Sequence, residues 1–159
     1  MVKQNKRKFS RIHIRWAVRL DFGTVEYKRF VNNVSLNGLY VEGEFQQMIG
    51  DVCIINLKPS CLFPDEPVHA VGCVTRTSKH GVAMKFLSMK LDSFFFLQTT
   101  LLYKAVDPSL LGKEFVINNT TFKIEDDLIV FEPFPMDFQS MKQVQHLLLR
   151  PNSAERNNA

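Results

Sequence analysis

The sequence predicts a mainly β fold in which six short strands form a closed barrel or a sandwich, followed by a helix. Three observations carry this prediction. Apolar and polar residues alternate in short segments of the first half of the chain, and turn residues separate these segments at regular intervals. After residue 88 the apolar period changes to that of a helix. Short strands with regularly spaced turns are typical of barrels and sandwiches.

The overall composition is that of a globular protein. A length of 159 residues suits one compact domain, and 45% hydrophobic with 23% charged residues is far from the composition of a disordered chain. No apolar run is long enough for a membrane span, and no apolar segment follows the first basic residues as in a secretory signal. Three cysteines without CxxC spacing indicate reduced thiols, which predicts a cytoplasmic protein. They are Cys53, Cys61 and Cys73.

The first strand is expected at residues 12–21. The arginines at 7, 11, 15 and 19, of which the first two precede this strand, would by their spacing also fit one face of a helix. The large apolar residues decide for a strand, because they occupy every second position and are β-branched, aromatic or leucine. These residues are Ile12, Ile14, Trp16, Val18 and Leu20. Arg15 and Arg19 then lie on the polar face of the strand.

Five further strands follow, at about residues 25–33, 39–42, 50–57, 68–77 and 81–87. The tight connection at 33–38 ends at Gly38, which is available for a positive φ. Prolines punctuate a loop at 59–67, and residues 78–81 form the turn of a hairpin.

The helix is expected at residues 88–105, where Asp107-Pro108 ends it. The run Phe94-Phe95-Phe96-Leu97 makes it apolar on more than one face, so the C-terminal extension or a second protomer should cover it. Residues 113–132 alternate again, with a turn at Asn118-Asn119, and Asp137 could cap a final amphipathic helix. The expected organisation is a flexible basic arm (1–11), a barrel with its helix (12–106), a hairpin-plus-helix extension (107–150) and a disordered tail (151–159).

The charge distribution favours an anionic partner. The net charge is only +4, but seven of the 20 basic residues come before the first acid, Asp21. Such an arm would attract nucleic acid, an anionic membrane surface or a small phosphorylated ligand, although basic termini are often only solvated. The seven residues are Lys3, Lys6, Arg7, Lys8, Arg11, Arg15 and Arg19.

No pattern of an enzyme or a metal site is present, so we predict neither catalytic residues, nor a metal, nor a cofactor. The four histidines are far apart, without the spacing of metal ligands or of a catalytic helix. The paired acids at 65–66 and 126–127 are better explained as solvated turns.

Two short motifs stand out in combination. The first is Arg7-Lys8-Phe9-Ser10-Arg11, an RxxxR immediately before the first strand. The second is the segment 33–38, an NxSxxG between the second and third strands. RxxxR alone is uninformative, since Arg11/Arg15 and Arg15/Arg19 have the same spacing, and NxSxxG alone could be a polar turn. In this order and setting, however, the pair resembles the PilZ family of bacterial cyclic di-GMP receptors. The segments Val71-Gly72-Cys73-Val74 and 81–86 also resemble two later strands of that family. The resemblance covers about residues 6–106 and implies a six-stranded antiparallel barrel followed by a helix.

The resemblance implies which residues bind the ligand. Arg7 and Arg11 would hold the phosphates and guanines, because a guanidinium pairs bidentately with phosphate oxygens and with guanine O6 and N7. Lys8 would be a further phosphate partner. Asn33 and Ser35 would offer an amide and a hydroxyl to one guanine edge, although aspartate is common at the first of these positions. Gly38 would permit close backbone approach, and Arg76 would stack on a base unless it is simply solvated.

The implied function is that of a receptor rather than an enzyme. Ligand binding would fold the mobile arm over the barrel, and the signal would pass to a separate downstream protein. A homodimer through the Phe94–Phe96 helix or the extension is possible on this interpretation. Alternatives are a PilZ-fold adaptor that does not use the nucleotide, and a receptor for another guanine cyclic dinucleotide. A basic nucleic-acid binder is the least favoured, because the strands lack interleaved exposed aromatic residues.

Overall fold

Six antiparallel strands close into a barrel in this computed structural model, which describes residues 10–58, 68–117 and 122–131. Hydrogen bonds link them in the order β3-β2-β5-β6-β7, and β4 pairs with both β3 and β7 and so closes the ring. The predicted six-stranded antiparallel barrel is therefore confirmed. Its strands are β2 (Ala17–Asp21), β3 (Glu26–Val34), β4 (Gly38–Glu42), β5 (Val52–Lys58), β6 (Val68–Thr77) and β7 (Gly81–Lys90).

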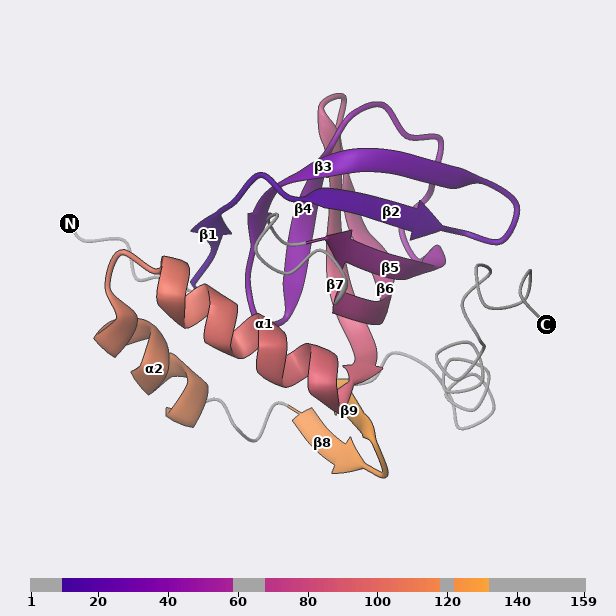
Figure 1. The fold of residues 1–159 in the computed structure, drawn as a ribbon. Coiled ribbons are helices and arrows are strands. Elements are labelled where there is room, and N and C mark those ends of the chain that lie inside the picture. Colours follow the sequence, from indigo (N-terminus) through magenta and orange to yellow (C-terminus); the bar gives the residue numbers. More distant parts are fainter. Residues whose placement is uncertain (1–9, 59–67, 118–121, 132–159) are drawn as a thin grey trace.

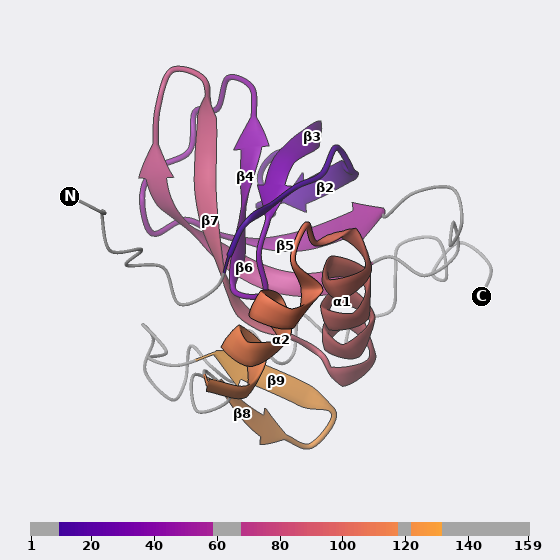
Figure 2. The same ribbon diagram turned by 90° about the vertical axis from the view of Figure 1, so that its left-hand side faces the viewer.

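The remaining elements surround one end of this barrel (Figures 1 and 2). β1 (Ile12–His13) pairs with the far end of β3. Helix α1 (Leu91–Lys104) lies across the end of the barrel, and α2 (Pro108–Ile117) lies beside α1. A hairpin of β8 (Phe122–Glu125) and β9 (Leu128–Phe131) extends the sheet, because β9 pairs with the last residues of β7.

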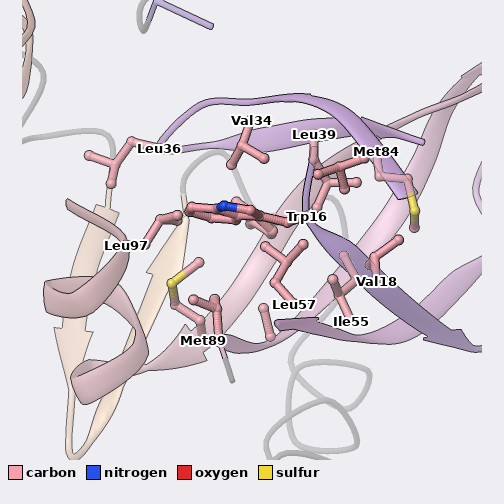
Figure 3. Packing of buried hydrophobic residues seen from close by; sticks show 14 of the residues in the cluster. Trp16, Val18, Val34, Leu36, Leu39, Ile55, Leu57, Met84, Met89 and Leu97 are labelled. Carbon is pink, nitrogen blue, oxygen red and sulfur yellow. The ribbon is translucent and has the colours of Figure 1, made fainter. Parts of the chain in front are cut away.

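The barrel and α1 share one hydrophobic core. Trp16 is buried at its centre, with Leu57 and Leu39 from the barrel on one side and Leu97 of α1 at the end (Figure 3). Full burial of a leucine side chain such as that of Leu57 or Leu97 contributes roughly 1.5–3 kcal/mol. Helix α1 buries Phe94, Leu97 and Leu101 in the same cluster, so it covers the end of the barrel and is part of its core.

The first predicted strand is interrupted. Residues 12–21 form two strands, β1 and β2, with 14–16 between them, although Ile14 and Trp16 are buried as the alternation predicts. Both strands pair with β3, but their registers differ by one residue, since Ile12 faces Val34 while Ala17 faces Phe30. The ladder must break to absorb this residue. The alternation of buried and exposed residues continues through residues 14–16, so the sequence pattern could not show that the strand is interrupted there.

The predictions after residue 87 need three corrections. The helix begins at Leu91 rather than at residue 88, because β7 continues to Lys90 in order to pair with β9. Residues 113–117 are helical rather than extended and belong to α2. The hairpin turns at Asp126-Asp127 instead of Asn118-Asn119, and Asp126 has a φ of 55°, which aspartate tolerates better than most residues. The expected helix after Asp137 and the tail 151–159 lie outside the described residues, as does most of the arm.

The extension supplies part of the cover predicted for the aromatic face of α1. Phe131 of β9 is buried, with its ring centroid 6.3 Å from that of Phe94 and 6.0 Å from that of Phe86. Phe95, by contrast, is 52% exposed. Intramolecular packing therefore accounts for one side of the helix and leaves Phe95 at the surface.

Two of the cysteines are free and buried on opposite sides of the sheet. Cys53 belongs to the main core, whereas Cys73 packs with Val71, Leu87 and Leu128 in a separate small cluster. Burial raises the pKa of both thiols, that of Cys53 strongly. Reduced, packed thiols were expected here. Cys61 lies outside the described residues.

His69 is expected to make stability depend on pH. Its Nδ1 hydrogen-bonds to Asn56 Oδ1, and its backbone N–H donates to Ser93 Oγ at 3.0 Å. Burial, and to a lesser extent Lys90 and Arg19, lower its pKa. The unfolded chain therefore binds the proton more readily, so the free energy of unfolding should fall as the pH drops through the usual histidine pKa of about 6.5. Urea unfolding between pH 7 and 5 measures this. His69→Gln should show a weaker pH dependence than the wild type, and an identical slope would refute the assignment.

Candidate functional site

The candidate site is built on the outer face of the barrel, where β1, β3, β4, β7 and β6 lie side by side. Paired residues on neighbouring strands share a face of the sheet. A row of such paired residues, one from each strand, forms a rung across the sheet. The rung of interest consists of His13, Asn33, Tyr40, Ala83 and Arg76. The neighbouring pair, Leu39 and Met84, belongs to the core, so the rung of Asn33 and Tyr40 lies on the opposite, outer face of the sheet.

Two β-bulges shape this rung. Val31 faces Val41 and Asn33 faces Tyr40, so Asn32 is an extra residue on β3. Likewise, Thr75 is an extra residue on β6 between the pairs of Val74 and Arg76. A bulge directs two consecutive side chains to one side of the sheet, and bulges are frequent beside functional sites. The predicted residues Asn33 and Arg76 each lie at one of these bulges.

Asn33 is buried with an unsatisfied acceptor. Asn33 is only 9% exposed, and among the described residues no donor forms a hydrogen bond with its Oδ1. A buried carbonyl without a hydrogen bond costs about 1–3 kcal/mol, and such groups are rare enough to require an explanation. The position is therefore suited to accept a hydrogen bond from a bound molecule.

Ser35 and Gly38 form the turn between β3 and β4. The Ser35 backbone N–H donates to the Gly38 carbonyl at 2.8 Å, and Ser35 Oγ donates to Asn37 Oδ1 at 2.7 Å. The Ser35 proton is thus used inside the turn, which leaves its oxygen as an acceptor. Sequence reasoning assigned no role to Asn37. Its backbone carbonyl accepts the Phe86 N–H at 2.8 Å and so fixes the turn to β7.

The reason for glycine at position 38 differs from the expected one. Its φ is not in the positive range, in contrast to those of Gly23, Gly43 and Gly50. A Cβ at Gly38 would instead overlap the backbone carbonyl oxygen of Met84 on β7. Glycine is needed because β4 passes too close to β7 for a side chain. The predicted close backbone approach is made by the protein's own chain.

The arm reaches this site at its last residues. Arg11 is half-buried and directly precedes Ile12, whose partner on β3 is Val34. Arg11 therefore lies at the end of β3 that carries Asn33 and leads into the turn at Ser35. Arg7 and Lys8 lie outside the described residues. Arg76 is exposed, and three strand spacings separate it from Asn33, roughly 14 Å along the sheet.

An open groove of about 720 Å³ borders the same rung. On its wall the Arg15 guanidinium lies over the ring of Phe30, 4.7 Å from the centroid. Sequence reasoning placed Arg15 on the polar face of its strand but did not assign it a role. The outward position of Phe30 could have been found from the alternation of β3. The groove is lined by Arg15, Lys28, Arg29, Phe30, Asn32, Tyr40, Glu42, Gly43, Glu44, Lys79 and His80.

The described part of the chain contains no candidate metal site. Within it, no three histidine, cysteine or acidic side chains gather as a metal site would require. None of its helices has the length and apolar character needed to cross a membrane.

Comparison with known proteins agrees with this geometry. The family model of the PilZ domain matches residues 5–100. Two solved structures are similar to this chain. The PilZ domain with c-di-GMP of YcgR from Escherichia coli has a TM-score of 0.51 and 13% identity, over 73% of this chain and 97% of that one. The Bacillus subtilis inhibitor of motility (MotI/DgrA) has a TM-score of 0.52 and 11% identity, over 71% of this chain and 52% of that one.

These similarities differ in what they establish. At such low identities the solved structures show a common fold, and this chain spans only about half the length of MotI. A search of curated proteins found no match. The family model, however, covers more than half of the chain and includes both motifs. The chain belongs to the PilZ domain family.

Proposed function

We propose that this chain is a cyclic di-GMP receptor of the bacterial cytoplasm, which signals through a partner and catalyses no reaction. The observation that carries the proposal is the buried Oδ1 of Asn33, beside the end of the arm, to which no described residue donates a hydrogen bond. The Watson–Crick edge of guanine presents N–H donors that such an acceptor can receive. The PilZ fold and the two motifs support the same ligand.

The other predicted residues have complementary roles in this proposal. Arg7 and Arg11 hold the two phosphates and the O6/N7 edge of a guanine, and Lys8 adds a charge contact to a phosphate. Ser35 accepts a hydrogen bond through the oxygen that its turn leaves available. Gly38 keeps the turn close to β7.

A second guanine would find planar partners along the groove. The Arg15–Phe30 pair and Tyr40 line the groove. Arg76 lies on the same rung of the sheet as Tyr40. Stacking of a base on an aromatic ring or a guanidinium contributes about 1–3 kcal/mol. Arg76 is assigned to the far end of the ligand, because its distance from Asn33 excludes a shared contact with one small group.

The arm is the moving part of the proposed switch. Residues 1–11 carry Lys3, Lys6, Arg7, Lys8 and Arg11 and no acid, so binding of a dianion would neutralise their charge and fold the part of the arm before Ser10 over the barrel. The changed surface would then be read by a separate protein or by a second copy. The exposed Phe95 and Tyr103 on α1 are the apolar contacts that we assign to this step.

Calorimetric titration with cyclic di-GMP tests the proposal directly. We expect micromolar binding that excess GTP does not displace. No heat from the wild type would leave the PilZ fold as a protein-interaction adaptor. Equal or tighter binding of another guanine cyclic dinucleotide would identify that molecule as the ligand.

Substitution of Asn33 should change ligand affinity without lowering the stability of the fold. Asn33→Leu keeps a similar shape but removes the unpaired acceptor, so the free energy of unfolding should not fall. Affinity for cyclic di-GMP should nevertheless decrease about tenfold, since a guanine donor loses its partner. Both are measured on the same preparation, by urea unfolding and calorimetry. Lower stability with unchanged affinity would mean that Asn33 has a structural role only.

A further inference from the structure

A carboxylate of the C-terminal extension holds the segment that carries the RxxxR motif. The backbone N–H of Ser10 donates to Glu114 Oε2 at 2.9 Å, and Ser10 Oγ donates to Glu114 Oε1 at 2.6 Å. The two residues are 104 positions apart, and both are half-buried. Hydrogen bonds to an ionised carboxylate are about twice as strong as neutral ones, and this pair engages both oxygens.

This contact fixes the chain on one side of Arg11. On the other side, Ile12 and His13 pair with Val34 and Asn33 of β3. The backbone of Arg11 is therefore held between two anchors, one on α2 and one on β3. Both anchors lie within two residues of it.

Helix α2 provides a firm base for the first anchor. Leu111, one turn before Glu114, is 2% exposed and belongs to the main core. Asp107 Oδ1 accepts the N–H of Leu110 at 3.1 Å and so caps the start of the helix. Residues at i and i+3 share a helix face, so Glu114 projects from the side that is packed against the protein. This helix lies beyond the residues that match the PilZ family model.

We propose that Glu114 is a positioning residue of the ligand site, which braces the arm so that Arg11 stays beside Asn33 and Ser35. This inference rests on the proposed function. A preordered arm loses less conformational freedom when the ligand binds, which increases affinity. By linkage, the ligand in turn stabilises α2. The negative charge of Glu114 repels a dianion, so its benefit comes from the hydrogen bonds that it accepts from Ser10 and not from attraction of the ligand.

The brace can be tested without ligand. Amide hydrogen exchange of residues 10–13 should be about tenfold faster in Glu114→Ala than in the wild type, because the lost bonds free the segment to open. Asp92→Ala removes an exposed acid from α1 and serves as the control, with unchanged exchange at 10–13. Unchanged exchange in Glu114→Ala would overturn the inference.

Affinity for cyclic di-GMP then separates positioning from charge. Glu114→Ala should bind about tenfold more weakly than the wild type. Glu114→Gln keeps an acceptor oxygen without the charge and should bind within about threefold of the wild type, or more tightly. Equal or tighter binding by Glu114→Ala would show that the contact competes with the ligand and would overturn the proposal. A wild type that binds no cyclic di-GMP would refute the proposed function instead, while the exchange result would still decide whether the brace exists.

Discussion

The double substitution Arg7→Ala/Arg11→Ala is expected to weaken cyclic di-GMP binding by about 100-fold or more, below the range of calorimetry. Loss of one partner from a hydrogen-bonded charge pair costs about 2–5 kcal/mol, and each arginine is assigned such a pair with phosphate or guanine. Lysine cannot restore this, because it offers a point charge without a planar fork. Arg7→Lys/Arg11→Lys should therefore recover only a small part of the affinity.

The control for this experiment removes the same charge from the same segment. Lys3→Ala/Lys6→Ala deletes two positive charges outside the motif. It should weaken binding only a few-fold, by about 1 kcal/mol or less, and the effect should diminish at higher salt. If the two double variants lose equal affinity, the arm attracts anions only by its net charge and the motif has no specific role. Tight, steeply salt-dependent binding to single-stranded nucleic acid would then favour the nucleic-acid alternative.

Phe131→Ala is expected to destabilise the protein by about 3–5 kcal/mol, as is usual when a buried aromatic side chain is removed. Phe131 is 2% exposed and contacts the rings of Phe86 in the barrel and Phe94 in α1. Its loss would leave a cavity where barrel, helix and extension meet. Trp16, the single tryptophan, is buried and reports unfolding in urea by its fluorescence.

Ile124 in the same hairpin provides the comparison. It is 65% exposed, so Ile124→Ala should change the free energy of unfolding by about 0.5 kcal/mol or less. A loss of less than about 1 kcal/mol for Phe131→Ala would mean that the hairpin is not part of the core. If this variant does not fold, Phe131→Leu should give a smaller but measurable loss, since it retains more of the buried volume.

The barrel could be predicted because its strands carry local information. Alternating burial along β2, β4 and β5 and turn residues between the strands specify which segments are extended and which side chains are internal. The same local reasoning located Asn33 and Ser35 at the end of β3. It failed after residue 87, because the continuation of β7 to Lys90 depends on pairing with β9, about 40 residues later in the chain. Residues 113–117 show how tertiary context overrides an ambiguous apolar pattern.

What the sequence by itself determined is the fold class, the family and the two motifs, since these depend on residue order and local periodicity. Only the tertiary structure decided how the motifs relate to the rest of the chain. The packing of Gly38 against Met84 and the hydrogen bonds from Ser10 to Glu114 join segments that are distant in sequence. The burial of Asn33 Oδ1 without a donor among the described residues likewise depends on distant segments. No periodicity records such contacts, because they arise only when the barrel closes and α2 packs beside it.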